Sequence, residues 1–321
     1  MKAIQLTEVG GPEVLKFVEV PEPEPGPGQA IVQLSAAGVN YMDVQARIGA
    51  SNPILPLIPG GEGSGIVIET GKGVTEVSIG DRVAYTGAGM SYAEKVCVPS
   101  WRLVKVPDGM DVEVGAAAML QGMTAHYLAF TTYPLKTSDT ALIHSGAGGV
   151  GLLLIQMAKM AGARVITTVS TKEKSAIAQD AGADHTILNS EQNVADEVMK
   201  ITKDQGVQVV YDAVGKETFE GSVASLSPRG YLVSYGAASG PVPPVPLSVL
   251  NPKSLFLTRP TLVSYTATRN ELEQRSADVL GWVKSGKLHV KIHGRYALKD
   301  AAEAHRDLQG RFTSGKLLLI P

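Results

Sequence analysis

Three glycines in the segment SGAGGVG have a spacing that could hold a phosphate group. Gly146, Gly148 and Gly151 satisfy G-x-G-x-x-G, shortly after the predicted strand 140–144 and at the start of a helical pattern at 150–161. Glycines at these positions permit a tight turn and a close approach of the backbone to a pyrophosphate, which the helix amides then face. The segment predicts a dinucleotide site; a purely structural glycine-rich turn is the alternative.

The end of the next predicted strand distinguishes between dinucleotides. NAD sites usually carry Asp or Glu about 20 residues after the glycines, to bind the ribose hydroxyls. This chain has VSTKEK at 169–174, where Ser170 and Lys174 could hold a 2′-phosphate that a carboxylate would repel. We therefore expect NADPH. Two alternatives stay open: Glu173 contacts the ribose, or Lys172 and Lys174 are solvated residues of a helix start.

The elements around these residues alternate between strand and helix. Apolar, β-branched strands are predicted at 140–144, 164–168, 185–188, 207–212 and 231–235, with helices between them. Strands without a polar face indicate a parallel sheet covered by helices on both sides. Asp212 ends one strand at the edge where ligands bind in such sheets, although it could equally cap the following loop.

The flanking segments predict a second domain. Residues before 110 form short β-segments between Gly/Pro turns, which is typical of a small barrel or sandwich. After a possible edge strand at 254–258, the tail holds helices at 269–285 and 298–309 and a strand at 316–320. This tail is too short for a domain of its own, so we expect it to pack on the N-terminal part.

The expected fold class is therefore α/β, with a doubly wound Rossmann sheet inserted in a β-rich domain. We place the boundaries at 1–122, 123–258 and 259–321. A helix is also predicted from Val112 to Thr131, at the first boundary.

Composition narrows the classes of function. The 321 residues carry a net charge of −2, which lacks the basic footprint of a nucleic-acid binder. The one cysteine, Cys97, excludes an internal disulfide and any zinc site with two thiolates from one chain. No secretory signal or membrane-spanning stretch is visible, so we expect a cytoplasmic protein without membrane partners.

Seven motifs together resemble one family along essentially the whole chain: AGVNYMD, PGGEGSGIV, GDRVAY, AAAMLQGMTAHYL, SGAGGVG, VVYDAVG and TRPTL. The chain resembles the zinc-independent quinone oxidoreductases of the medium-chain dehydrogenase/reductase superfamily, which are similar to zeta-crystallin. The resemblance implies a GroES-like catalytic domain, a Rossmann domain, a cofactor cleft between them, NADPH as cofactor, and a homodimer or homotetramer.

The resemblance also implies roles for individual residues. Asn40 and Thr124 would face the nicotinamide. The pyrophosphate would lie on Gly148, Gly149 and Val150, within the loop 146–151. Ser170 and Lys174 would meet the 2′-phosphate, although Asn189 and Ser190 stand where many relatives carry Tyr or Arg. Tyr235, Gly236 and Arg259 would line the cofactor cleft.

The expected chemistry needs no metal. Zinc-dependent relatives carry a cysteine in the segment matching 37–43 and a His-Glu pair matching 60–62, where this chain has Ala37-Gly38-Val39-Asn40 and Gly60-Gly61-Glu62. An acceptor carbonyl would instead be polarised by hydrogen bonds, with Asn40, Tyr41, Tyr127 and Arg259 as candidates. Asn40 is preferred because an amide suits both carbonyl and ribose contacts, whereas the two tyrosines could simply be packing residues.

The function that we expect is NADPH-dependent reduction of quinones. Within the same class, the alternative is an NADPH-dependent reductase of alkenal or enone double bonds. An alternative of another class is a non-catalytic NADPH- or RNA-binding protein similar to the crystallins, although the negative net charge argues against RNA.

Overall fold

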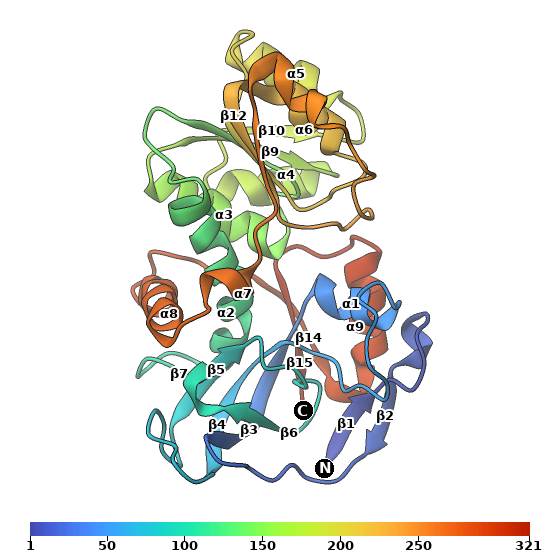
Figure 1. The fold of residues 1–321 in the computed structure, drawn as a ribbon, viewed down its shortest axis with the longest axis vertical. Coiled ribbons are helices and arrows are strands. Elements are labelled where there is room, and N and C mark those ends of the chain that lie inside the picture. Colours follow the sequence, from blue (N-terminus) through green and yellow to red (C-terminus); the bar gives the residue numbers. More distant parts are fainter. The chain divides into compact units, whose positions relative to one another are not determined.

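The computed structural model describes residues 1–321 as two compact units (Figure 1). Met1–Met123 and Thr266–Pro321 form one unit, and Thr124–Tyr265 forms the other. The second boundary lies beyond the expected 258/259 because Tyr265 packs within the inserted unit. Its ring stacks on Tyr127 with centroids 4.3 Å apart, and its hydroxyl bonds to Thr132 Oγ1 at 2.9 Å.

The inserted unit contains a six-stranded, entirely parallel sheet in the order β10-β9-β8-β11-β12-β13. This is the Rossmann order 3-2-1-4-5-6. Successive strands are added on one side of β8 as far as β10, and then on its other side, beginning with β11. The strands are β8 (Thr140–Ile143), β9 (Arg164–Val169), β10 (His185–Leu188), β11 (Val207–Asp212), β12 (Leu226–Ser234) and β13 (Phe256–Thr258).

Helices cover this sheet on both faces (Figure 1). They are α3 (Gly149–Met160), α4 (Lys172–Asp180), α5 (Val194–Thr202) and α6 (Phe219–Ser225), and the short elements η4 (Leu247–Lys253) and α7 (Leu262–Tyr265) follow. Buried side chains such as Leu142, Ile166 and Val210 fill the space between strands and helices, so the predicted apolar strands form the core.

The helix expected at 112–131 is shorter and changes type. The α-helix α2 (Val112–Tyr127) is followed by a π-helical turn, η3 (Leu128–Thr132). The Leu128 carbonyl accepts a hydrogen bond from the buried Tyr211 hydroxyl at 3.1 Å, so a side chain of the sheet satisfies a carbonyl at the wider turn. Tyr211 is 83 positions from Leu128, so local sequence spacing could not predict the change from α-helix to π-helix.

The first unit is built on a seven-stranded sheet with the path β14-β15-β3-β4-β5-β7, and β6 also pairs with β3. Its strands are β3 (Gln29–Val39), β4 (Glu62–Thr70), β5 (Arg82–Thr86), β6 (Lys95–Pro99), β7 (Val104–Lys105), β14 (Ile292–Ala297) and β15 (Lys316–Ile320). A separate hairpin contains β1 (Lys2–Gln5) and β2 (Lys16–Glu19). The helices are η1 (Pro12–Val14), α1 (Tyr41–Arg47), η2 (Ser100–Arg102), α8 (Arg269–Lys284), η5 (Leu298–Asp300) and α9 (Ala301–Gln309).

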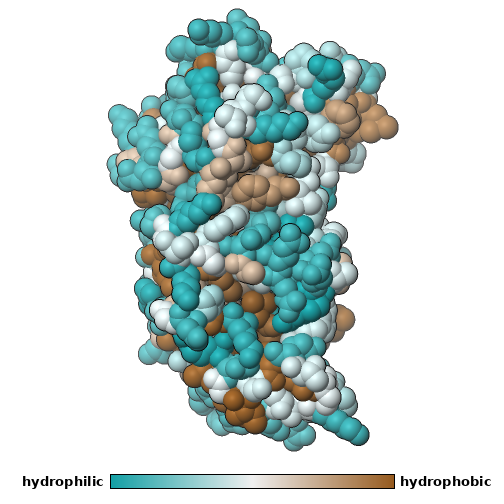
Figure 2. All heavy atoms as spheres, turned by 90° about the vertical axis from the view of Figure 1, so that its left-hand side faces the viewer, coloured by the Kyte–Doolittle hydropathy of each residue, from teal (hydrophilic) through white to brown (hydrophobic).

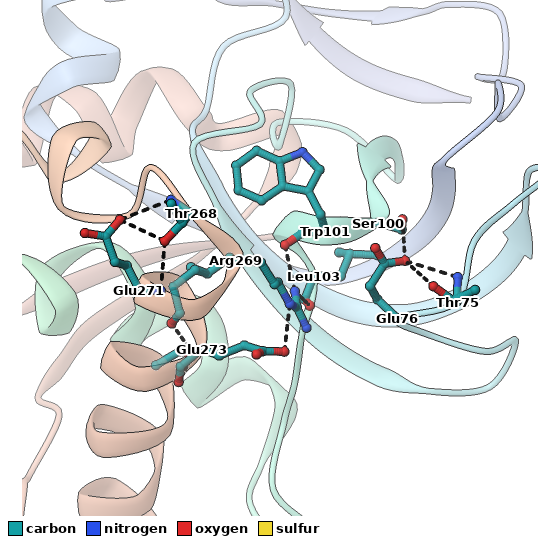
Figure 3. A network of polar contacts seen from close by, with 11 residues as sticks. Thr75, Glu76, Ser100, Trp101, Leu103, Thr268, Arg269, Glu271 and Glu273 are labelled. Carbon is teal, nitrogen blue, oxygen red and sulfur yellow. Dashed lines mark hydrogen bonds and ion pairs between the residues drawn. The ribbon is translucent and has the colours of Figure 1, made fainter.

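The returning tail is fastened to the N-terminal part by polar contacts at the start of α8 (Figure 3). The Arg269 guanidinium donates to the carbonyls of Trp101 at 2.7 Å and Leu103 at 2.6 Å, and it pairs with Glu273 at 2.7 Å. Thr268 caps the helix, because its hydroxyl accepts from the Glu271 amide at 3.3 Å. Together with strand β15, which pairs with β3, these contacts build the tail into the first unit.

The exposed surface in Figure 2 is mainly hydrophilic, and its apolar side chains are interspersed with polar ones. None of the helices combines the length and the apolar character that crossing a bilayer requires.

Candidate functional site

The glycine loop follows β8 and packs tightly against β9. A Cβ atom on Gly146 would lie 2.0 Å from Thr167 Oγ1, and Thr167 is fully buried and donates to the Ile143 carbonyl at 2.6 Å. A Cβ on Gly151 would lie 2.3 Å from the Ser145 carbonyl oxygen. No side chain fits at either position, so the loop can lie directly over the strand and the first turn of α3.

The N-terminus of α3 is available to bind an anion. Its N-cap is Gly148, which has no side chain to occupy the first amides, and Gly149, Val150 and Gly151 form the first turn. The first amides of a helix lack intrahelical acceptors, and the helix dipole adds positive potential there. The geometry of the loop therefore fits a pyrophosphate, and the binding of one by Gly148, Gly149 and Val150 stays a prediction.

A buried chain of hydrogen bonds supports the loop from beneath. Thr168 Oγ1 accepts from the Ser145 amide at 3.2 Å and lies 3.1 Å from His144 Nδ1. His144 Nε2 lies 3.0 Å from Ser222 Oγ, which in turn donates to Asp212 Oδ2 at 2.8 Å. Burial lowers the pKa of His144, so its ring is neutral at physiological pH.

Asp212 acts as a cap for the loop after β11. Its Oδ1 accepts from the amides of Val214 at 2.8 Å and Gly215 at 2.9 Å, and the Thr218 hydroxyl also bonds to the carboxylate at 2.8 Å. The carboxylate is 1% exposed. Of the two interpretations of Asp212, the structure therefore supports the cap, which fixes the strand end at the point where the sheet order reverses.

The predicted phosphate residues lie at the end of the neighbouring strand. Ser170 follows β9, Thr171 caps α4 by accepting from the Lys174 amide at 3.2 Å, and Lys174 lies in the first turn. Ser190 Oγ, after β10, donates to the Ser170 carbonyl at 3.2 Å. Bonds to its own backbone and to Thr171 lower the pKa of Glu173, so this carboxylate serves the helix start.

The remaining strand ends bring Tyr235, Gly236 and Arg259 to the same edge. The Tyr235 amide donates to the Asp212 carbonyl at 2.9 Å, and burial raises the pKa of its phenol. A Cβ on Gly236 would lie 2.5 Å from the Ala213 carbonyl oxygen. Arg259 Nη1 donates to Ser234 Oγ at 3.4 Å. The predicted cofactor residues follow four of the six strands, β8, β9, β12 and β13, and thus lie along one edge of the sheet.

Two predicted residues of the inserted unit lie in α2. Thr124 is 7% exposed, and Tyr127 ends the helix with its ring stacked on Tyr265. Burial raises the pKa of the Tyr127 phenol, so its hydroxyl keeps its proton. The stacking shows that the Tyr127 ring has a packing role, which leaves open a separate role for its hydroxyl as a donor.

Asn40 lies in the other unit, at the N-cap of α1, and its amide is already engaged. Nδ2 donates to the Gly38 carbonyl at 3.2 Å and to Glu62 Oε2 at 3.0 Å, and Oδ1 accepts from Lys316 Nζ at 2.8 Å. Both amide hydrogens are therefore committed, so the group can offer a further ligand only an acceptor. This limits the expected role in polarising a carbonyl, which requires a donor.

The short helix α1 was not predicted from the sequence. Asn40 and Asp43 cap its start, since the Asn40 amide donates to Asp43 Oδ2 at 2.8 Å, and Tyr41 is its first, half-buried residue. The spacing N-x-x-D was the available signal. Tyr92 OH donates to Asp43 at 3.1 Å and lies 3.0 Å from His305 Nε2.

Burial sets the charges of Asp43 and His305, which lie on either side of the Tyr92 hydroxyl. It raises the pKa of Asp43 to about 6 against the opposing bond from Asn40, and it lowers the pKa of His305 to about 3. Both side chains are almost fully buried.

Known proteins share this arrangement over the whole chain. Residues 26–108 match the alcohol dehydrogenase GroES-like domain, and residues 149–284 match the family described as zinc-binding dehydrogenase. A quinone oxidoreductase of Pseudomonas aeruginosa is 44% identical over 100% of this chain and 99% of its own length. The chain belongs to the quinone oxidoreductases of the medium-chain dehydrogenase/reductase superfamily.

Other members extend the comparison. A 2-haloacrylate reductase of a Burkholderia species is 39% identical over 97% of this chain and 96% of its own. The crystal structure of Escherichia coli quinone oxidoreductase complexed with NADPH is 39% identical, covers 100% of both chains and has a TM-score of 0.98. The expected family and fold class are thus confirmed, and this quinone oxidoreductase homologue is an oxidoreductase.

The zinc in the matched family description does not fit the residues of this homologue. No group of three or more His, Cys, Asp or Glu side chains is placed to hold a metal ion. Glu62 is the one acidic donor of the segment 60–62, and its carboxylate accepts from Lys316 Nζ at 2.5 Å and from the Leu120 amide at 2.6 Å. An ammonium group at that distance would repel a metal cation.

Proposed function

We propose that this chain oxidises NADPH and reduces a quinone without a metal ion. The observation that carries the proposal is the convergence of the glycine loop with Ser170 and Lys174 at one edge of the Rossmann sheet. A relative with a TM-score of 0.98 was solved in complex with NADPH, which supports the same cofactor here.

Each part of the edge has a separate task in this proposal. The amides of Gly149 and Val150 bind the pyrophosphate, and Ser170 with Lys174 binds the 2′-phosphate, while the chain from Asp212 to Thr168 holds the loop in place. Gly236 lets the chain after β12 pack directly against the backbone of Ala213. Tyr235, Thr124 and Arg259 line the rest of the cofactor site in this proposal. Bound NADPH would supply the hydride.

In the other unit, Asn40 accepts a hydrogen bond from the cofactor through Oδ1, because its amide hydrogens are committed to Gly38 and Glu62. Polarisation of the acceptor carbonyl then falls to the other donors among the expected residues, Tyr41, Tyr127 and Arg259. Burial keeps the Tyr127 hydroxyl protonated, as a donor must be.

The second candidate function is reduction of a conjugated carbon–carbon double bond. The 39% identical 2-haloacrylate reductase favours it, since its named substrate is such a compound. A homodimer or homotetramer and a cytoplasmic location stay predictions. The full-length oxidoreductase relatives argue against the alternative of a non-catalytic NADPH- or RNA-binding protein.

The test is NADPH oxidation by the purified protein with quinones, enones, 2-haloacrylate and aldehydes, followed by identification of the products. Quinone reduction with hydroquinone formation supports the proposal, and saturated products support the second candidate. A folded protein that binds RNA in a salt-sensitive manner and oxidises NADPH with none of these acceptors would contradict both. Metal analysis of the active protein, with stoichiometric zinc as the contrary result, tests the metal-free part.

A further inference from the structure

A lysine and a glutamate form an ion pair deep inside the first unit. Lys316 begins β15 and Glu62 begins β4, 254 positions apart, and their Nζ and Oε2 atoms are 2.5 Å apart. Both side chains are 0% exposed. Other ion pairs are exposed to solvent: the side chains of Lys2 and Glu19, for example, are 46% and 75% exposed.

Stability alone is a poor reason for this pair. Removing two charges from water costs several kcal/mol per ion, and apolar replacements of buried pairs are often neutral or stabilising. The fold nevertheless makes room for the pair at Gly38. A Cβ atom there would lie 2.4 Å from Glu62 Oε2 and 2.7 Å from Lys316 Nζ.

Both charges converge on the amide of Asn40. Lys316 Nζ donates to Asn40 Oδ1 at 2.8 Å, whereas Glu62 Oε2 accepts from Asn40 Nδ2 at 3.0 Å. The amide thus has a cation at its oxygen and an anion at its nitrogen. A rotation of 180° would bring oxygen to the carboxylate and nitrogen to the ammonium, so the pair defines one orientation. The Leu120 amide fixes Glu62 Oε1 at 2.6 Å.

We infer that Lys316 and Glu62 are positioning residues that lock the Asn40 amide in one orientation, so that Asn40 serves its ligand as a hydrogen-bond acceptor only. The contact with the cofactor rests on the proposed function, whereas the lock on the amide rests on the geometry alone. Neither charged side chain needs to touch the cofactor or the substrate.

The test compares Lys316→Met/Glu62→Gln, which removes both charges together, with Lys316→Met alone, Asn40→Ala and the triple variant. Lys2→Met is the matched control, a strand lysine from an exposed pair. Three quantities are measured: the thermal midpoint, the dissociation constant of NADPH, and exchange of the Asn40 side-chain amide hydrogens by NMR without cofactor.

We expect the double variant to fold with a midpoint near that of the parent, to exchange the Asn40 hydrogens about tenfold faster or more, and to bind NADPH about tenfold more weakly. The triple variant should bind no more weakly than Asn40→Ala, because the lock acts through Asn40. Lys316→Met alone should lose stability as well, since it leaves Glu62 unpaired.

Parent-like exchange and NADPH affinity in a folded double variant would overturn the inference, as would effects on affinity that simply add to those of Asn40→Ala. If the parent protein fails to bind NADPH, the proposed function is wrong. The exchange of the Asn40 hydrogens then still decides whether the pair locks the amide.

Discussion

Thr167 Oγ1 occupies the space that a Cβ atom on Gly146 would need, at 2.0 Å. Thr167 cannot move aside cheaply, because it is fully buried and bonded to the Ile143 carbonyl. Gly146→Ala should therefore push the loop away from β9, cost about 1–3 kcal/mol of unfolding free energy, and weaken NADPH binding by about tenfold or more. Thermal denaturation and a fluorescence titration with NADPH measure the two effects.

Gly221→Ala is the matched control, since Gly221 lies in α6 of the same unit and a Cβ there meets nothing within 4 Å. It should keep NADPH affinity and gain up to about 1 kcal/mol from helix propensity. Unchanged affinity in Gly146→Ala would show that the loop does not hold the pyrophosphate.

Lys174→Ala should discriminate between the two dinucleotides. The lysine lies in the first turn of α4, beside the strand end that carries Ser170. Loss of a charge-assisted bond to the 2′-phosphate should weaken NADPH binding about tenfold and leave NADH binding unchanged. Lys172→Ala removes the same charge from an exposed residue of that turn and should change neither. Equal losses for both dinucleotides in Lys174→Ala would contradict the assignment.

Asp43 should make the protein less stable as the pH rises from 4 to 6. Burial moves its pKa from 3.8 to about 6, so the folded state holds a proton that the unfolded state has released. The full difference corresponds to about 3 kcal/mol. His305 opposes it, because its lowered pKa makes stability rise with pH over the range from about 3 to 6.5. Asp43→Asn removes one of these two contributions.

The thermal midpoint of Asp43→Asn, relative to that of the parent, should therefore rise as the pH rises from 4 to 7. The midpoints of the two proteins should be most alike at pH 4. Parallel midpoint curves for the two proteins over this range would show that Asp43 does not titrate there.

The predicted dimer can be tested at the free edge of the Rossmann sheet. β13 pairs only with β12, and its residues Phe256 and Leu257 are 49% and 42% exposed. An unpaired edge with apolar side chains can pair with a second copy. Leu257→Asp should shift the protein to monomers in light scattering, whereas Ile79→Asp, at an exposed apolar residue of the other unit, should not. A monomeric parent protein would contradict the dimer.

The sequence predicted the cofactor edge because its signals are local. The glycines and Ser170 come shortly after strands and Asp212 ends one, and parallel strands bring their carboxyl ends to one edge. The lock on Asn40 was missed because Lys316 and Glu62 meet only through the pairing of β15 and β4 with β3. Local spacing holds no information about a contact between residues 254 positions apart.

The buried chain beneath the glycine loop was missed for a similar reason. His144 and Ser222 are 78 positions apart, and each is an ordinary polar residue in its own segment. The sequence did mark Asp212, yet it could not distinguish a ligand contact from a cap, because that choice depends on the amides of Val214 and Gly215.

The measurement that tests the central claim most directly is a calorimetric titration of the purified protein with NADPH and, separately, with NADH. If Ser170 and Lys174 bind the 2′-phosphate, we expect one NADPH per chain and an affinity for NADPH about tenfold or more above that for NADH. Absence of NADPH binding, or equal affinity for both dinucleotides, would contradict the account.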